Sequence, residues 1–272
     1  MSTPGPVSEF QRLHWKEGAA RAAAIDSITT EEPLEIRLRG QSIAVTMRTP
    51  GHDAELAAGF LFSENILKDR SEILEIAHCP DTPVTARGNI INVFTPTGFN
   101  FDASQLSRHF FTSSSCGVCG RSAIEEIQRS HSPLGNDTLQ VQAETLIKLP
   151  PKLKQAQTTF SKTGGLHAAG LFNPSGDLIV SREDIGRHNA VDKVLGHAFL
   201  NEIKLNNTLL LVSGRVSFEI IQKALVGRIP FIAAISAPSS LAIQSAEENG
   251  QTLVAFLREH SLNLYTGPHR LT

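Results

Sequence analysis

The sequence predicts an α/β fold (α+β overall) with a small β-rich amino-terminal α+β domain, residues 20–138, and a carboxyl-terminal α/β domain, residues 139–272. Two observations predict this division. Apolar and polar residues alternate between Glu32 and Met47, as in a half-buried hairpin. Beyond residue 139, short apolar runs alternate with segments of helical spacing. Runs such as Leu209–Val212 are typical of strands that are buried on both faces of a sheet.

The amino-terminal domain is predicted to hold a hairpin, a helix and a further strand. Residues 1–17 contain proline, glycine and few apolar anchors, so we expect a loose tail there. The turn of the hairpin falls at Gly40, between two alternating segments. Asp53 is expected to cap a helix over residues 53–67, which Gly59 weakens locally. Residues 89–96 form the further strand.

The carboxyl-terminal domain is predicted to alternate helices and strands. We expect helices over residues 151–165, 187–202, 216–227 and 239–250, and strands over 167–173, 177–183, 208–214, 230–236 and 252–257. Ligands of open α/β sheets bind in the crevice beyond the carboxyl ends of the strands. Three strand-to-helix junctions, at residues 182–193, 212–219 and 235–242, offer charged or small hydroxyl-bearing residues and helix amides. We therefore expect a crevice for an anionic ligand at these junctions.

The composition excludes several classes of protein. The formal net charge is −2 and 40% of the residues are hydrophobic, so no basic excess indicates a nucleic-acid partner. No apolar run reaches the roughly 18–20 residues that span a bilayer, and the amino terminus has no apolar secretory segment. Three cysteines make no disulfide framework for 272 residues. We expect a cytoplasmic protein without a membrane partner.

The pair Cys116 and Cys119, in "SSSCGVCG", is the most chemically suggestive motif. A structural zinc site would need two more ligands, and neither Cys79 nor His109 lies at a ligand-like spacing. A zinc deaminase would need a His-x-Glu motif and a proline before the pair, but Ser115 precedes it. A redox dithiol and two merely packed cysteines also remain open.

A further possibility is a thiolate that accepts and passes on a sulfur atom. The segment after the pair is predicted to be helical, and a helix amino terminus stabilises a thiolate through its dipole and free amides. Arg121 adds a positive charge, and glycines on both sides would let the loop move between donor and acceptor.

Several long motifs, in order, resemble the formate dehydrogenase accessory sulfurtransferase (FdhD) family. The resemblance begins near Glu32 and continues to the end of the chain. The motifs are "EEPLEIRL", "TPGHDAELAAGFLFSENI", "SSSCGVCG", "FSKTGGLHAAGLF", "SREDIGRHNAVDKVLG", "LLVSGRVSFEIIQKA" and "AAISAPSSLAIQSAEENGQTLVAFLR".

This resemblance implies a cytoplasmic sulfur carrier and homodimer, with a three-layer carboxyl-terminal domain similar to the cytidine deaminase fold. A cysteine desulfurase would load a persulfide on Cys116, with Cys119 as its supporting partner. The sulfur would pass to the molybdenum or tungsten of the bis(molybdopterin guanine dinucleotide) cofactor of a formate dehydrogenase. No intrinsic metal is implied. The implied cofactor-binding residues are Phe256, Leu257, Arg258, Glu259, His260 and Ser261.

The chain departs from the family pattern at two positions. Arg121 replaces the usual lysine and keeps its charge, whereas Ser261 replaces a common arginine and removes a cation that could contact the cofactor's phosphates. Three other functions stay open: a cofactor chaperone without sulfur chemistry, a nucleotide-processing enzyme with a deaminase-like fold, and a dithiol redox protein.

Overall fold

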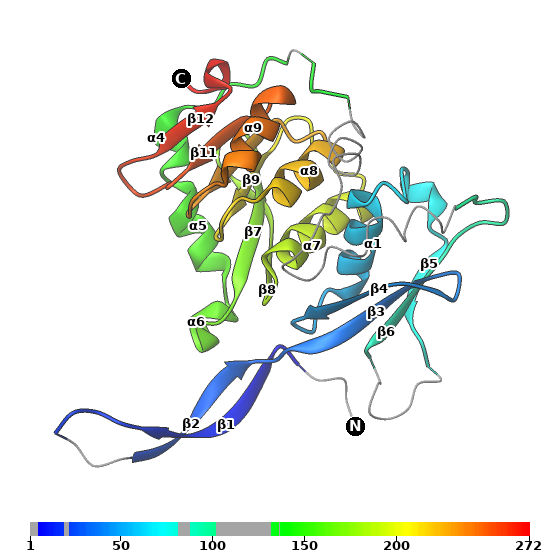
Figure 1. Cartoon of the computed structure of the whole chain (residues 1–272), viewed down its shortest axis with the longest axis vertical. Coiled ribbons are helices and arrows are strands. Elements are labelled where there is room, and N and C mark those ends of the chain that lie inside the picture. Colours follow the sequence, from blue (N-terminus) through cyan, green and yellow to red (C-terminus); the bar gives the residue numbers. More distant parts are fainter. Residues whose placement is uncertain (1–4, 19–21, 81–87, 102–131, 136) are drawn as a thin grey trace.

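The computed structural model describes residues 5–18, 22–80, 88–101, 132–135 and 137–272. Within these ranges the chain forms a two-stranded arm, a four-stranded sheet and a six-stranded sheet (Figure 1). The predicted mixed α/β class is confirmed. The domain boundaries and the likeness to the cytidine deaminase fold stay predictions.

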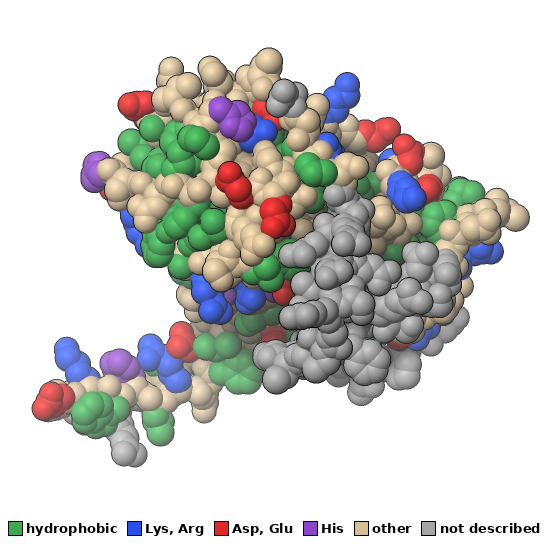
Figure 2. All heavy atoms as spheres, turned by 45° about the horizontal axis from the view of Figure 1, so that its top comes forward, with side chains coloured by type: hydrophobic (Ala, Val, Ile, Leu, Met, Phe, Trp, Pro, Cys, Tyr) green, Lys and Arg blue, Asp and Glu red, His purple; other side chains and the backbone are tan. Residues whose placement is uncertain are grey.

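The arm consists of β1 (Val7–His14) and β2 (Ala22–Thr29), which pair antiparallel along their full lengths. It projects away from the rest of the molecule (Figures 1 and 2). The expectation of a loose tail is therefore wrong for Val7–His14, the residues that form β1. The strand β1 satisfies its backbone groups against β2, and the alanine-rich β2 carries little of the β-branched signal that predicts strands.

The four-stranded sheet has the order β4-β3-β6-β5 and packs against one helix. Its elements are β3 (Glu32–Leu38), β4 (Gln41–Arg48), β5 (Glu75–His78), β6 (Ile90–Phe94), the helix α1 (Asp53–Ser63) and the short helix η1 (Arg70–Glu72). The predicted hairpin and the strand near residue 90 are confirmed. Arg39 and Gly40 adopt positive φ at the hairpin turn, a conformation that glycine accepts most easily.

The predicted cap of α1 is wrong. His52, with φ 58°, stands at the N-cap without a side-chain cap bond. The carboxylate of Asp53 is engaged elsewhere, because it accepts hydrogen bonds of 3.0 Å from both Nε and Nη2 of the buried Arg48. This bidentate pair fixes the end of β4 against the start of α1.

The six-stranded sheet has the order β12-β11-β10-β9-β7-β8, in which β9, β10 and β11 are parallel, while β7 is antiparallel to β9 and β12 to β11. Its strands are β7 (His167–Phe172), β8 (Leu178–Asp184), β9 (Leu209–Val212), β10 (Phe231–Ala234), β11 (Thr252–Ala255) and β12 (Asn263–Thr266). All four residues of β9, β10 and β11 are buried, as predicted for strands covered on both faces.

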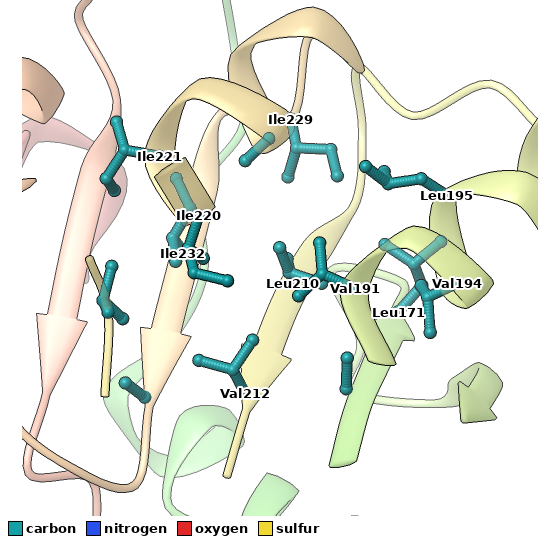
Figure 3. Packing of buried hydrophobic residues seen from close by; sticks show 14 of the residues in the cluster. Leu171, Val191, Val194, Leu195, Leu210, Val212, Ile220, Ile221, Ile229 and Ile232 are labelled. Carbon is teal, nitrogen blue, oxygen red and sulfur yellow. The ribbon is translucent and has the colours of Figure 1, made fainter. Parts of the chain in front are cut away.

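Helices cover both faces of this sheet. One core lies between the sheet and α7 (Arg187–Leu200), α8 (Phe218–Val226) and α9 (Ser240–Glu248) (Figure 3). The other lies against α4 (Ala143–Leu146) and α5 (Leu149–Ala156). The predicted helix over 151–165 is divided into α5 and α6 (Phe160–Thr163), which ends at Gly164 with φ 68°. The short helix η4 (Pro268–Arg270) closes the chain.

The helices α1 and α7 cross at two glycines. A Cβ added to Gly59 would lie 1.8 Å from the carbonyl oxygen of Asp192, and one added to Gly196 would lie 1.8 Å from that of Glu55. No real side chain fits at such distances, so Gly59 is required for the crossing even though it weakens α1 as an isolated helix.

Buried charges also join the two sheets. Lys223 on α8 donates to both oxygens of Asp192 on α7, at 2.8 and 3.0 Å, and to the hydroxyl of Ser63 on α1, at 2.8 Å. Lys193 pairs with the buried Asp184 at 2.7 Å and donates to the carbonyl of Thr49. These bonds fix the orientation of the four-stranded sheet on the larger one.

Candidate functional site at the carboxyl edge of the six-stranded sheet

Four strands end at one edge of the six-stranded sheet, which we call the carboxyl edge. The strands β8, β9, β10 and β11 run in one direction and end at Asp184, Val212, Ala234 and Ala255. The helices α7, α8 and α9 each begin just after one of these strands. Three helix amino termini, with their positive dipole ends, therefore lie along this edge, although the hydroxyl of Ser239 already accepts a hydrogen bond from the amide of Ala242 in α9.

Backbone hydrogen bonds join the loops of the carboxyl edge to one another. Val216 donates to the carbonyl of Ala237 at 3.1 Å, and Ser239 donates back to Val216 at 2.9 Å. Phe256 donates to Ser236 at 3.2 Å, which connects the β11–β12 loop to the same group. The structure thus brings together the predicted junctions at residues 212–219 and 235–242 and the segment Phe256–Ser261.

A positive group of side chains lies at the β7–β9 part of this edge. Burial lowers the pKa of His167, and the neighbouring Arg187 and Arg215 lower it further, against an opposing effect of Asp184. The imidazole of His167 lies close to the backbone of Gly214. A Cβ at position 214 would lie 3.1 Å from Nδ1 of His167, so the absence of a side chain there allows this approach. Among the described residues, neither arginine has an ion-pair partner, and Nε of Arg187 is buried without a hydrogen bond. This part of the edge is suited to an anion.

His188 lies beside this group as a neutral imidazole. Burial, aided by the charge of Arg187, lowers its pKa to about 4, against an opposing effect of Glu219. Its Nε2 lies 3.1 Å from the hydroxyl of Ser217, the N-cap residue of α8. The hydroxyl of Ser217 makes no cap bond, so it does not occupy the amides in the first turn of α8.

Phe256 stands at the edge in an unusual conformation. Its φ is 50°, and 39% of its surface is exposed although it directly follows the buried strand β11. A bulky residue with positive φ is uncommon, and such residues cluster at ligand sites. An exposed aromatic ring at this edge is suited to stacking on a planar base.

The rest of the predicted binding segment is divided between core and surface. The side chain of Leu257 is fully buried in the core beneath α4 and α5, so it does not face a ligand at the edge. Arg258, Glu259, His260 and Ser261 are exposed. The guanidinium of Arg258 already donates to the carbonyls of Ile235 and Leu257, and its amide donates to Ser261 at 2.8 Å. Their roles in binding stay predictions.

Cys116 and Cys119 lie outside the described residues, as do Arg121 and His109. Cys79 is partly buried and lies directly after β5. Within the described ranges, no group of three His, Cys, Asp or Glu side chains is placed to hold a metal ion. No helix in those ranges is both long and apolar enough to cross a membrane.

Sequence reasoning missed the pairing of His188 with Ser217, because 29 positions separate the two residues. No local spacing signals such a contact. The sequence offered one general rule, that the carboxyl ends of parallel strands meet at one edge of a sheet. This rule located the strand-to-helix junctions, but it does not say which side chains contact one another there.

The geometry defines a class of protein: a helix-covered mixed sheet in which four strands run in one direction and end at a carboxyl edge suited to an anion. The comparisons then give the family. The FdhD/NarQ family matches residues 29–272, and the chain belongs to it. The predicted family resemblance is therefore confirmed.

Relatives named sulfur carrier protein FdhD are similar over nearly the whole chain. The protein from Streptomyces avermitilis is 45% identical, covering 98% of this chain and 96% of its own. The one from Mycobacterium tuberculosis is 46% identical over 91% and 92%. The crystal structure of a candidate formate dehydrogenase accessory protein from Desulfotalea psychrophila superposes with a TM-score of 0.79, at 27% identity, over 98% of this chain and 100% of that one.

Proposed function

We propose that this chain is a sulfur carrier that serves a formate dehydrogenase. The observation that supports this proposal most strongly is the family match over residues 29–272, together with relatives at 41–47% identity that are named sulfur carrier proteins. The Cys116/Cys119 pair supplies the thiols that such a carrier needs. A reducing cytoplasm, where thiols persist, is the location we propose.

Loading would be a persulfide exchange. The thiolate of Cys116 attacks the outer sulfur of a persulfide on a cysteine desulfurase, the donor's sulfur–sulfur bond breaks, and the donor cysteine leaves as a thiolate. The product is a persulfide on Cys116, with no net oxidation or reduction. The reaction follows the rules of thiol–disulfide exchange, so it needs an accessible thiolate and a good leaving thiol.

Delivery of this sulfur as sulfide requires two electrons, and Cys119 can supply them. Its thiolate attacks the inner sulfur of the Cys116 persulfide, which forms a Cys116–Cys119 disulfide and releases hydrosulfide to the acceptor. A cellular dithiol reductant then restores both thiols. This step gives Cys119 its supporting role.

The acceptor is the metal of the bis(molybdopterin guanine dinucleotide) cofactor, which we treat as a substrate. The carboxyl edge fits the anionic nucleotide part of this molecule, because Arg187 has an orphaned Nε and three helix amino termini converge nearby. Arg187 and Arg215 would hold phosphate groups, and Phe256 would stack on the guanine. Nε2 of neutral His188 would accept a hydrogen bond from the hydroxyl of Ser217, which keeps that hydroxyl away from the α8 amides.

Intact-protein mass spectrometry tests the loading step. The protein is incubated with a cysteine desulfurase and free cysteine and kept under non-reducing conditions. We expect the mass of at least one added sulfur atom, which reductant removes and which Cys116→Ala lacks. Cys119→Ala should load normally but release little hydrosulfide. Equal loading of the Cys116→Ala variant would contradict the proposal.

Binding of guanosine diphosphate tests the carboxyl edge. We expect Phe256→Ala to weaken binding by roughly tenfold or more, since stacking on an aromatic ring contributes about 1–3 kcal/mol. Phe94→Ala is a matched control, because Phe94 is also 39% exposed but lies on the four-stranded sheet. If both variants bound guanosine diphosphate with equal affinity, Phe256 would not be part of the binding site.

A cofactor chaperone without sulfur chemistry is the second candidate. The anion-ready edge favours it, since the residues of this edge are separate in the sequence from the cysteines. The chaperone predicts that Cys116→Ala still activates the client, whereas the carrier predicts that activation is lost.

A further inference from the structure

His167 lies at the carboxyl edge beside the arginines proposed above to hold phosphate groups. It is the first residue of β7, which runs antiparallel to β9 and therefore begins where β9 ends. A Cβ built on Gly214 would lie 3.1 Å from Nδ1 of His167 and 3.6 Å from Cβ of Arg187. The imidazole and the base of the Arg187 side chain thus lie against the same backbone position.

Reciprocal hydrogen bonds fix the backbone of His167 against the loop between β9 and α8. The amide of Ala168 donates to the hydroxyl of Ser213 at 2.9 Å, and the amide of Ser213 donates to the carbonyl of Ala168 at 2.9 Å. Ala168 follows His167, and Ser213 precedes Gly214, so both bonds lie directly beside the contact. The backbone therefore sets the position of the imidazole before any ligand arrives.

The imidazole of His167 makes no hydrogen bond or ion pair within the described part of the chain. The residue is partly exposed, so a ligand can reach it. Nε of the neighbouring Arg187 is buried without a hydrogen bond. A buried polar atom without a partner is uncommon in native proteins, so this nitrogen indicates a ligand within reach of both side chains.

We propose that His167 is a third ligand of the phosphate groups at the carboxyl edge, beside Arg187 and Arg215, and that its imidazole takes up a proton when the anion binds. This inference rests on the proposed binding of a guanine nucleotide at this edge. The imidazolium donates a charge-assisted hydrogen bond to a phosphate oxygen. One proton comes from solvent for each anion bound, and no bond of the ligand forms or breaks.

The charges around His167 favour this change of protonation. In the free protein, burial lowers the pKa of His167, and Arg187 and Arg215 lower it further, against an opposing effect of Asp184. Asp184 is paired with Lys193 at 2.7 Å, which compensates its charge. The free imidazole is therefore neutral near pH 7. A phosphate held by the arginines adds negative charge, and an opposite charge within about 4–6 Å raises the pKa of a histidine.

The neighbouring His188 does not share this role. Burial and the charge of Arg187 lower its pKa to about 4, although Glu219 lies 3.9 Å away and opposes the effect. Its Nε2 is also engaged with the hydroxyl of Ser217. A rise of about two pH units on anion binding would still leave His188 neutral near pH 7. Proton uptake near neutral pH therefore belongs to His167.

Nuclear magnetic resonance measures this proton directly. The imidazole carbons are labelled with carbon-13, and the signal of His167 is the one that His167→Gln lacks. We expect a titration midpoint below the ordinary value of about 6.5 in the free protein, and a rise of about one pH unit or more with saturating guanosine diphosphate. Sulfate is a second probe, because it stays a dianion throughout this range. A midpoint that neither probe raises would overturn the proposal.

Calorimetric affinities for guanosine diphosphate test whether the proton strengthens binding. The affinity of wild type is divided by that of His167→Gln at about pH 6 and about pH 8, which cancels the titration of the nucleotide's own phosphate. A ligand that raises a pKa binds the protonated protein more tightly. We therefore expect this ratio to be about tenfold larger at the lower pH.

His269→Gln is the matched control. His269 is exposed and lies in η4, at the opposite edge of the sheet, because β12 runs antiparallel to β11. This variant should bind guanosine diphosphate as wild type does at both pH values.

A ratio that does not change with pH would overturn the proposal and leave the nucleotide site in place. Absence of guanosine diphosphate binding to wild type would instead overturn the nucleotide site, and the response of His167 to sulfate would then decide whether the edge takes up a proton with an anion. Sulfur loading on Cys116 involves neither probe, so the sulfur-carrier proposal can fail separately.

Discussion

The two sheets of this molecule are covered differently. The six-stranded sheet has helices on both faces, whereas the four-stranded sheet packs against α1 on one face and leaves Val45, Met47 and Phe94 exposed on the other. The helix α1 in turn lies on α7. The smaller sheet therefore shares its covering helix with the larger one, and the contact between them determines how it sits.

The contact between α1 and α7 also differs in chemistry from the two cores. The cores consist mostly of aliphatic side chains, as in Figure 3, whereas the contact relies on two glycines and on hydrogen bonds to Thr49 and Ser63 from the buried, ion-paired Lys193 and Lys223. Aliphatic cores tolerate volume-conserving changes. Buried pairs are costly to break, and their bonds are directional. Single substitutions should therefore destabilise the protein more at the α1–α7 contact than in the cores.

The largest effect is expected at Lys223. Replacing it with methionine leaves Asp192 buried without its cation, although burial already raises the pKa of that carboxyl. We expect a loss of about 3–5 kcal/mol in the free energy of unfolding, measured by denaturant titration. The double variant Lys223→Met, Asp192→Leu should recover much of this loss. If the double variant instead lost the sum of the free energies that the two single variants lose, the two residues would not act as a pair.

A smaller effect is expected at the helix crossing. Gly196→Ala places a methyl group against the carbonyl of Glu55 and must push α1 away from α7, at a cost of about 1–3 kcal/mol. Gly135→Ala is the control, since a Cβ there meets nothing within 4 Å. Similar melting temperatures for both variants would mean that the crossing adapts freely.

The smallest effect concerns a partly exposed ion pair in the larger region. The guanidinium of Arg270 holds the pKa of Asp137 below its usual value, through hydrogen bonds of 2.7–3.1 Å. A lowered folded-state pKa contributes stability above the ordinary aspartate pKa, and this stability is lost as the pH falls through the folded pKa. Asp137→Asn should cost about 1–2 kcal/mol near neutral pH. The difference from wild type should shrink in acid, and a pH-independent difference would contradict this.

Sequence patterns predicted the larger region well because its elements are locally determined. Continuous apolar runs identified β9, β10 and β11, and each expected helix between them is present. The arm was missed because β2 contains alanines and β1 gains its structure only from pairing. The cap of α1 was wrong because Asp53 binds Arg48, a contact that local propensity does not encode.

The candidate site was predictable as a location and not as a set of contacts. The strand-to-helix junctions were expected to meet, and they do. The strained φ of Phe256 and the buried Nε of Arg187 depend on how four loops pack together. Such packing leaves no signal in the spacing of residues.

The central claim is that sulfur on Cys116 reaches the cofactor of a formate dehydrogenase. The most direct test is activation of sulfur-free formate dehydrogenase by purified carrier that has been preloaded with labelled sulfur, with all other sulfur sources removed. We expect one burst of activation, with label in the enzyme's cofactor and none from Cys116→Ala. Full activation by an unloaded carrier, or by Cys116→Ala, would contradict the account and leave a chaperone in its place.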